Sequence, residues 1–202
     1  LFEDAWNGWT LGNFYIEGWH DKNWFYKYAD AYRDRRQFIE AARKYEELIT
    51  FYPDDLKGLM AYAHMETYDT ANYQHAESIL KEVLGVHVND HRAMLAFGDN
   101  YFEWSDEEPS KLEDARFVYA TILDSWGGKD EILLRMLRYF LKKKDDVNIL
   151  RLKEMFQKEK NVSADPSYFS RVFSELGGYL LDKGEPAEAL SILLRAEMEF
   201  NE

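Results

Sequence analysis

Residues 25–53 read FYKYADAYRDRRQFIEAARKYEELITFYP, and this stretch decides the fold. Its aromatic and small residues follow a spaced pattern: Phe25-x2-Tyr28-Ala29-x2-Tyr32, then Ala41-x3-Tyr45, then Pro53. Small residues at Ala29 and Ala41 let two helices approach closely, while the aromatic positions fill the space around them. The stretch therefore predicts a hairpin of two packed helices that ends near the proline.

The pattern returns along the rest of the chain. The position of Ala29 recurs at Ala63, Gly98 and Gly177, and a weaker copy centres on Leu137, so the steps are 34, 35, 39 and 40 residues. Self-similarity at this period indicates stacked helical hairpins rather than one globular core. We therefore expect an all-α protein of about ten antiparallel helices in five hairpins.

The five copies differ in how well they keep the pattern. The last copy reads Phe173-x2-Leu176-Gly177-x2-Leu180, then Ala189-x3-Leu193, with the same separation of twelve residues between its small positions as the first copy. The second and third copies read Leu59-x2-Tyr62-Ala63 with Ala76-x3-Leu80, and Met94-x2-Phe97-Gly98-x2-Tyr101 with Ala115-x3-Tyr119. A separation of seventeen residues in the third copy predicts a longer turn around residues 106–110. The fourth copy, Leu133-x2-Met136-Leu137-x2-Phe140, has no alanine in its second helix and is degenerate.

This pattern resembles the tetratricopeptide repeat (TPR), whose positions read W-x2-L-G-x2-Y, A-x3-F, P. The resemblance covers roughly residues 22–202 and implies repeats at about 22–55, 56–90, 91–128, 129–166 and 167–202. It also implies an α-solenoid that coils as a right-handed superhelix. In that family the first helices of the repeats line a concave groove, which takes a peptide or a helix from a protein partner.

Carried over position by position, the resemblance assigns groove-facing side chains. They are Tyr26, Asp30 and Arg33 from the first copy, Met60 and His64 from the second, Leu95, Asp99 and Phe102 from the third, and Arg138 from the fourth. Members that bind chaperone tails use a clamp of lysine, asparagine and arginine. Here Asp30 and Asp99 stand in place of asparagine, and Tyr26 in place of lysine, which disfavours an acidic tail. A helix or a mixed-charge surface is the expected ligand, with aromatic anchors supplying most of the affinity.

Residues 1–21 do not fit the repeat. They contain Trp6, Trp9 and Trp19, and three glycines that would weaken a helix. Three interpretations are open: the segment caps the apolar end of the array, it is the remnant of a further repeat upstream, or it is an arm that binds a partner.

The charge of the chain limits the classes of partner that it is expected to bind. The net charge is −13, which argues against nucleic acid and against acidic membranes. Residues 129–160 nevertheless carry 10 basic and 6 acidic groups, with the run Lys142-Lys143-Lys144 at their centre. This basic island is either a solvated helix end, where cations favour the last carbonyls, or a docking patch for an acidic partner or a second copy of the chain.

No constellation of residues indicates catalysis or a cofactor. The chain has no cysteine, no phosphate-binding glycine loop and no apolar run of membrane-spanning length. His87, Asp90 and His91 have a spacing that could ligate a metal, but they fall across an expected turn between helices, so we predict no metal site. The acidic, cysteine-free composition, rich in tyrosine and tryptophan, is similar to that of bacterial envelope TPR proteins, including the periplasmic flagellar-collar proteins of spirochaetes.

We therefore expect a non-enzymatic scaffold or adaptor that binds a protein partner without cofactors, as part of a larger assembly. Two alternatives stay open: a regulatory or targeting part of a longer enzyme, and a structural unit that assembles with copies of itself. The second alternative predicts oligomers that dissociate as salt rises.

Overall fold

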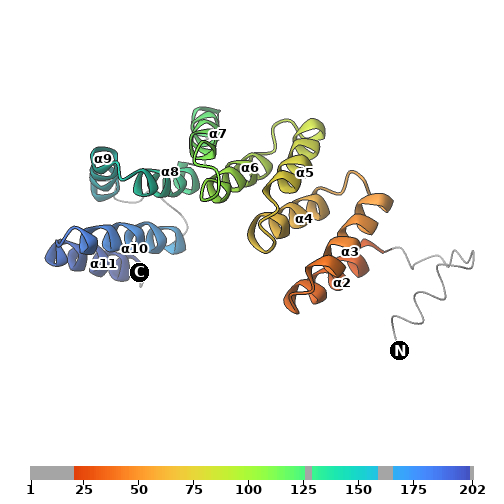
Figure 1. Cartoon of the computed structure of the whole chain (residues 1–202). Coiled ribbons are helices and arrows are strands. Elements are labelled where there is room, and N and C mark those ends of the chain that lie inside the picture. Colours follow the sequence, from red (N-terminus) through yellow and green to blue (C-terminus); the bar gives the residue numbers. More distant parts are fainter. Residues whose placement is uncertain (1–20, 126–128, 159–165, 201–202) are drawn as a thin grey trace, which may run out of the picture. The chain divides into compact units, whose positions relative to one another are not determined.

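The computed structural model describes residues 21–125, 129–158 and 166–200 of the 202. These residues form ten helices and no strand (Figure 1), which confirms the all-α prediction. The chain divides into two compact units, residues 1–86 and 87–202, and each is described by itself. Residues 1–20, with Trp6, Trp9 and Trp19, lie outside the described part.

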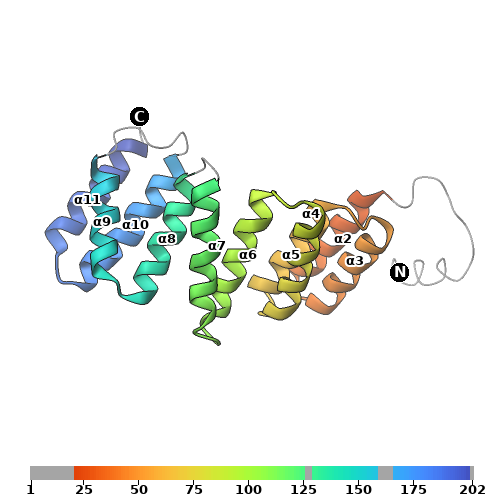
Figure 2. The ribbon, with the colours of Figure 1, turned by 90° about the horizontal axis from the view of Figure 1, so that it is seen from above.

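The N-terminal unit holds two hairpins. Helices α2 (Lys22–Asp34) and α3 (Phe38–Phe51) form the first, and α4 (Leu56–Tyr68) and α5 (Tyr73–Val86) form the second, with the two helices of each pair side by side (Figure 2). Ala29 and Ala41 are completely buried where α2 meets α3, and Ala63 and Ala76 are buried in the same way in the second hairpin. The predicted close packing at the small positions is confirmed.

The C-terminal unit holds three hairpins. They are α6 (His91–Trp104) with α7 (Lys111–Ser125), α8 (Lys129–Lys143) with α9 (Asp146–Lys158), and α10 (Pro166–Asp182) with α11 (Pro186–Phe200). The turn between α6 and α7 spans residues 105–110, which confirms the longer turn expected in the third copy. No helix in the described part of the chain is both long and apolar enough to span a membrane.

Two glycines lie at close approaches between paired helices. A Cβ atom added to Gly98 would lie 2.5 Å from Cε1 of Tyr119, and one added to Gly177 would lie 3.0 Å from Cδ2 of Leu193. The degenerate fourth hairpin has no small residue at the equivalent positions. Leu137 and Ile149 occupy them, and both are completely buried.

The ends of the helices follow from local sequence. Asp21, Asp55 and Asp90 cap α2, α4 and α6 by accepting hydrogen bonds from the backbone N–H groups of Asn23, Gly58 and Ala93. Pro53 lies between α3 and α4, while Pro166 and Pro186 begin α10 and α11, where their missing N–H groups are harmless. His87 and His91 lie on either side of the turn that Asp90 closes, as expected. The right-handed coil and the repeat boundaries stay predictions of the resemblance.

Replacing Gly98 by alanine will destabilise the protein, because the new methyl group would overlap the buried ring of Tyr119. We expect a loss of about 1 to 3 kcal/mol in the free energy of unfolding. Gly85, near the end of α5, is the matched control, since a Cβ atom there meets nothing within 4 Å among the described residues. Urea denaturation of both variants measures the effect. An unchanged Gly98→Ala midpoint would contradict the packing account.

Candidate partner-binding face

On the first helix of every hairpin, a buried position is followed directly by a more accessible one. Ala29, Ala63, Gly98, Leu137 and Gly177 are all buried. The residues that follow them are Asp30, His64, Asp99, Arg138 and Gly178; Asp99 is half-buried and the other four are exposed. The buried positions are all small or aliphatic, whereas the accessible ones differ in charge and size from hairpin to hairpin.

In the N-terminal unit, Arg33 joins the first helices of the two hairpins. From α2 its Nε donates to the Asp69 carboxylate just beyond α4, and its Nη2 lies 3.0 Å from Nδ1 of His64 on α4. An arginine can only donate, so Nδ1 of His64 is the acceptor where this contact is a hydrogen bond. The His64 ring also lies 4.6 Å from the ring of Tyr68.

Asp30 and Met60 complete this part of the surface. Asp30 accepts a 3.2 Å hydrogen bond from the hydroxyl of Tyr45, and burial together with this carboxylate raises the pKa of Tyr45 to about 12. Met60 is half-buried on α4. We call Asp30, Arg33, Met60 and His64 the first-helix face of the N-terminal unit.

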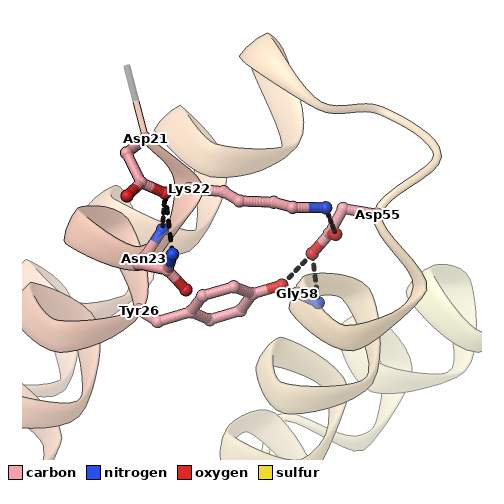
Figure 3. Close-up of polar contacts among 6 residues, drawn as sticks. All are labelled: Asp21, Lys22, Asn23, Tyr26, Asp55 and Gly58. Atoms are coloured by element: carbon pink, nitrogen blue, oxygen red, sulfur yellow. Dashed lines mark hydrogen bonds and ion pairs between the residues drawn. The ribbon is translucent and has the colours of Figure 1, made fainter. Parts of the chain in front are cut away.

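Tyr26, which the resemblance places in the groove, instead joins the two hairpins (Figure 3). Its side chain is only 8% exposed, and its hydroxyl donates to the carboxylate of Asp55, the residue that caps α4. Asp55 also accepts from Lys22 Nζ at 3.0 Å and from the backbone N–H of Gly58 at 2.9 Å. Burial and the neighbouring Asp55 carboxylate raise the pKa of the Tyr26 hydroxyl.

Leu95 also has a packing role, since it is 4% exposed in a cluster with Tyr119 and Ile122. Tyr26 and Leu95 therefore leave the set of candidate contact residues. The reason is physical: a side chain with almost no accessible surface offers a partner almost no area to bury.

In the C-terminal unit, Asp99 is held by two neighbours. Both of its oxygens accept from Arg135 of α8, from Nε and from Nη2 at 2.7 Å each, and the hydroxyl of Tyr119 donates to it at 2.7 Å. Burial opposes the charge on Arg135, but the Asp99 carboxylate outweighs it and raises the guanidinium pKa. Arg138, one turn further along α8, donates from Nε to Glu175 of α10 at 2.9 Å.

Phe102 lies under a lysine. The ammonium group of Lys142 is 4.5 Å from the centre of the Phe102 ring, 3.2 Å from the Phe102 carbonyl oxygen and 2.8 Å from the carboxylate of Asp106. Beside it Glu103 is half-buried, and burial raises the pKa of its carboxyl group. We call Asp99, Phe102, Arg138 and Gly178 the first-helix face of the C-terminal unit.

Within the described residues, five cations of the basic island pair with neighbouring hairpins of the same unit. Besides Lys142, Lys143 contacts Glu113 at 2.8 Å and Lys153 contacts Glu188 at 2.7 Å. Lys143, with Arg116 and Tyr139, lowers the pKa of Glu113 to about 2. These contacts favour a structural role for Lys142 and Lys143 over a docking patch. Lys144 follows the end of α8 with φ of 55°, and no ion pair to it is found within the described residues.

A repeated contact that sequence reasoning missed links successive hairpins here. Tyr139 and Lys143 both reach Glu113 near the start of α7, and Tyr179 and Lys183 both reach Asp146 at the start of α9. The signal is a Tyr-x3-Lys pair that recurs after 40 residues, with an acidic residue opening the second helix of the preceding hairpin. Arg135 and Asp69 were also missed, because they lie outside the repeat positions.

Substitutions of Asp55 will separate its capping role from its charge. Asp55→Ala removes both, and we expect a loss of about 1 to 3 kcal/mol in the free energy of unfolding at neutral pH. Asp55→Asn keeps a capping oxygen, so its loss will be smaller. Hydrogen bonds from Tyr26, Lys22 and Gly58 outweigh burial and hold the pKa of Asp55 below its ordinary value.

A lowered pKa means that this contribution is complete above the unfolded-state pKa of about 4 and is lost as pH falls through the folded-state value. The wild type and Asp55→Asn should therefore converge in stability under acid. Urea denaturation at several pH values, followed by circular dichroism, measures this. A difference between the two proteins that is constant with pH would contradict the assignment.

Neutralising the three adjacent lysines one at a time will show which are structural. Lys142→Gln should lower the free energy of unfolding by about 0.5 to 1 kcal/mol and Lys143→Gln by less, because exposed ion pairs are weak. Lys144→Gln is the matched control and should leave stability unchanged. The two losses should shrink in high salt. Equal effects at all three positions would contradict the pairing described above.

Comparison with known proteins supports the architecture. No family model and no curated protein sequence matches this chain. Among solved structures, a tetratricopeptide repeat protein from Parabacteroides merdae superimposes with a TM-score of 0.67 and 13% identity, over 89% of this chain and 65% of that one. This chain thus spans less than two thirds of that protein.

Two crystal structures of MamA match over a larger share of their own length. They have TM-scores of 0.58 and 0.55 and identities of 15% and 17%, and they cover 88% and 85% of this chain and 91% and 93% of MamA. At these identities the likeness concerns the fold alone. Together with the packed helical hairpins, it shows that this chain has the TPR-like fold that its sequence pattern predicts.

Proposed function

We propose that this protein is a non-enzymatic scaffold, which binds a protein partner through the first-helix faces of its two units. The observation that carries the proposal is the alternation between a buried residue and an accessible one on all five first helices. The packing between helices restricts the buried residue to small or aliphatic types. The accessible neighbour is under no such restriction, and here it is an acid, a histidine, a base or a glycine.

The charged groups on these faces are held in place before any partner arrives. Arg33 is fixed by Asp69, and Arg138 by Glu175, yet the side chain of Arg138 keeps 45% of its surface accessible. Side chains that are already ordered lose less conformational freedom on binding, so they favour a specific contact. A partner with mixed charges and separate apolar anchors, one for Met60 on the N-terminal unit and one for Phe102 on the C-terminal unit, fits this chemistry.

The TPR-like fold adds support, because stacked helical hairpins generally present extended binding surfaces. Whether the two faces line one concave groove stays a prediction of the resemblance, as does the bacterial envelope setting. Self-assembly through the basic island is less favoured, since Lys142 and Lys143 already have acidic partners within the unit.

Substitutions on the first helices should abolish capture of a partner, whereas substitutions on the second helices should not. His64→Ala and Arg138→Ala test the two faces, because both residues are exposed. The matched controls are Ile39→Ala on α3 and Phe117→Ala on α7, whose side chains are 69% and 70% exposed. Each tagged full-length protein would serve as bait in its native source, and captured proteins would be quantified by mass spectrometry.

We expect the wild type and both controls to hold the same protein and at least one first-helix variant to lose it. Affinity for the purified partner should then fall by about tenfold or more, with unchanged thermal melting. Loss of the partner only with Ile39→Ala or Phe117→Ala would place the interface on the second helices and contradict the proposal. Retention by all four variants would contradict it as well.

A further inference from the structure

Two adjacent glycines on α10 have different surroundings. Gly177 is buried against the side chain of Leu193, so the packing of α10 on α11 requires a small residue there. Gly178 is exposed, and a Cβ atom built on it would meet nothing within 4 Å in the part of the chain that the structure describes. Its backbone φ is not positive either, so neither packing nor conformation explains this glycine.

Glycine is the poorest helix former after proline, so Gly178 weakens α10 without an internal benefit. A glycine within a helix allows another backbone to approach closely. Gly178 also occupies the accessible position next to the buried small residue, the same position that Asp30, His64, Asp99 and Arg138 hold in the other hairpins. The side chains around Gly178 therefore indicate which kind of ligand could approach its backbone so closely.

The three residues of this face of α10 within about one turn of Gly178 are Ser174, Leu181 and Asp182. Leu181, one turn after Gly178, leaves 54% of its surface exposed, and Ser174, one turn before, is also exposed. Asp182 is exposed at the last residue of the helix, where the backbone carbonyls add negative potential. The adjacent Lys183 does not offset this charge, because it pairs with Asp146 at 2.6 Å.

On the side towards α8, the pair of Arg138 and Glu175 lies one turn before Gly178. It borders the face with two charges that largely cancel each other. The exposed face from Ser174 to Asp182 thus has no side chain at its centre, Gly178, an apolar side chain at Leu181 and a negative charge at its end. Charge complementarity favours a ligand with a positive charge near that end.

We propose that this face of α10, formed by Ser174, Gly178, Leu181 and Asp182, seats an amphipathic helix from a partner protein. The partner helix crosses closely over Gly178, places an apolar side chain against Leu181 and directs a lysine or arginine one turn away towards Asp182. This inference rests on the proposed function and names the chemistry of its ligand on the C-terminal unit.

Gly178→Ala separates the binding role from stability. Because alanine is the better helix former, the variant should melt about 2 to 4 °C higher than the wild type. Its methyl group should block the close approach and weaken binding by about tenfold or more. Gly85→Ala is the matched control, since it also fills open space on a helix, in the other unit. It should raise stability and leave binding unchanged.

The probe is a phage-displayed library of short helical peptides, selected on the wild-type full chain. Enriched peptides would be synthesised, and their affinities measured for the wild type, Gly178→Ala, Gly85→Ala and Asp182→Lys by fluorescence anisotropy. We expect an apolar residue followed one turn later by lysine or arginine, with binding lost in Gly178→Ala and Asp182→Lys only. Sedimentation of the wild type and Gly178→Ala tests whether a second copy occupies the face instead.

The outcomes distinguish this inference from the proposed function. Peptides that bind Gly178→Ala as tightly as wild type, or that lack the basic residue, would overturn the proposed binding site on α10. If the binding of such peptides still depended on His64 or Arg138, the proposed scaffold function would stand without the binding site on α10. No enrichment, or a dimer that Gly178→Ala dissociates, would also overturn the partner-helix proposal.

Discussion

Close contact between the two helices of each hairpin is the constraint on which the rest of the structure depends. In four of the five hairpins a small residue lies where the helices meet, at Ala29, Ala63, Gly98 and Gly177. Where the fourth hairpin lacks small residues, Leu137 and Ile149 are both fully buried instead. That hairpin is also where the ion pairs to neighbouring helices concentrate, through Arg135, Arg138, Lys142 and Lys143 of α8.

The same constraint fixes which residues a partner can reach. In an α-helix the residue after a buried one points about 100° away from it. After the buried position of the five first helices, that residue is exposed in four hairpins and half-buried at Asp99 in the third. Packing between the helices therefore restricts the buried residues, whereas the residues that directly follow them can differ from hairpin to hairpin. Asp30, His64, Arg138 and Gly178 show how widely that second set varies in one chain.

The sequence pattern was sufficient for the parts of the fold that depend on contacts within a hairpin. The hairpins, the long turn after Trp104 and the buried alanines all follow from residues fewer than about twenty positions apart. Contacts between hairpins could not be predicted in this way, because the repeat positions do not encode them. Tyr26 illustrates the difference, since its position implied a partner contact until the cap of the next hairpin, Asp55, was found beside it. The sequence does not single out Gly178, because a glycine next to Gly177 reads as part of the same packing signal.

The most direct test of the account is hydroxyl-radical footprinting of the full chain with and without its captured partner, read by mass spectrometry. This measurement reports the accessibility of individual side chains. The account predicts that His64, Phe102 and Leu181, on first helices, become protected when the partner binds, while Ile39 and Phe117, on second helices, react as before. Protection of Ile39 and Phe117 with unchanged labelling of the other three would contradict it.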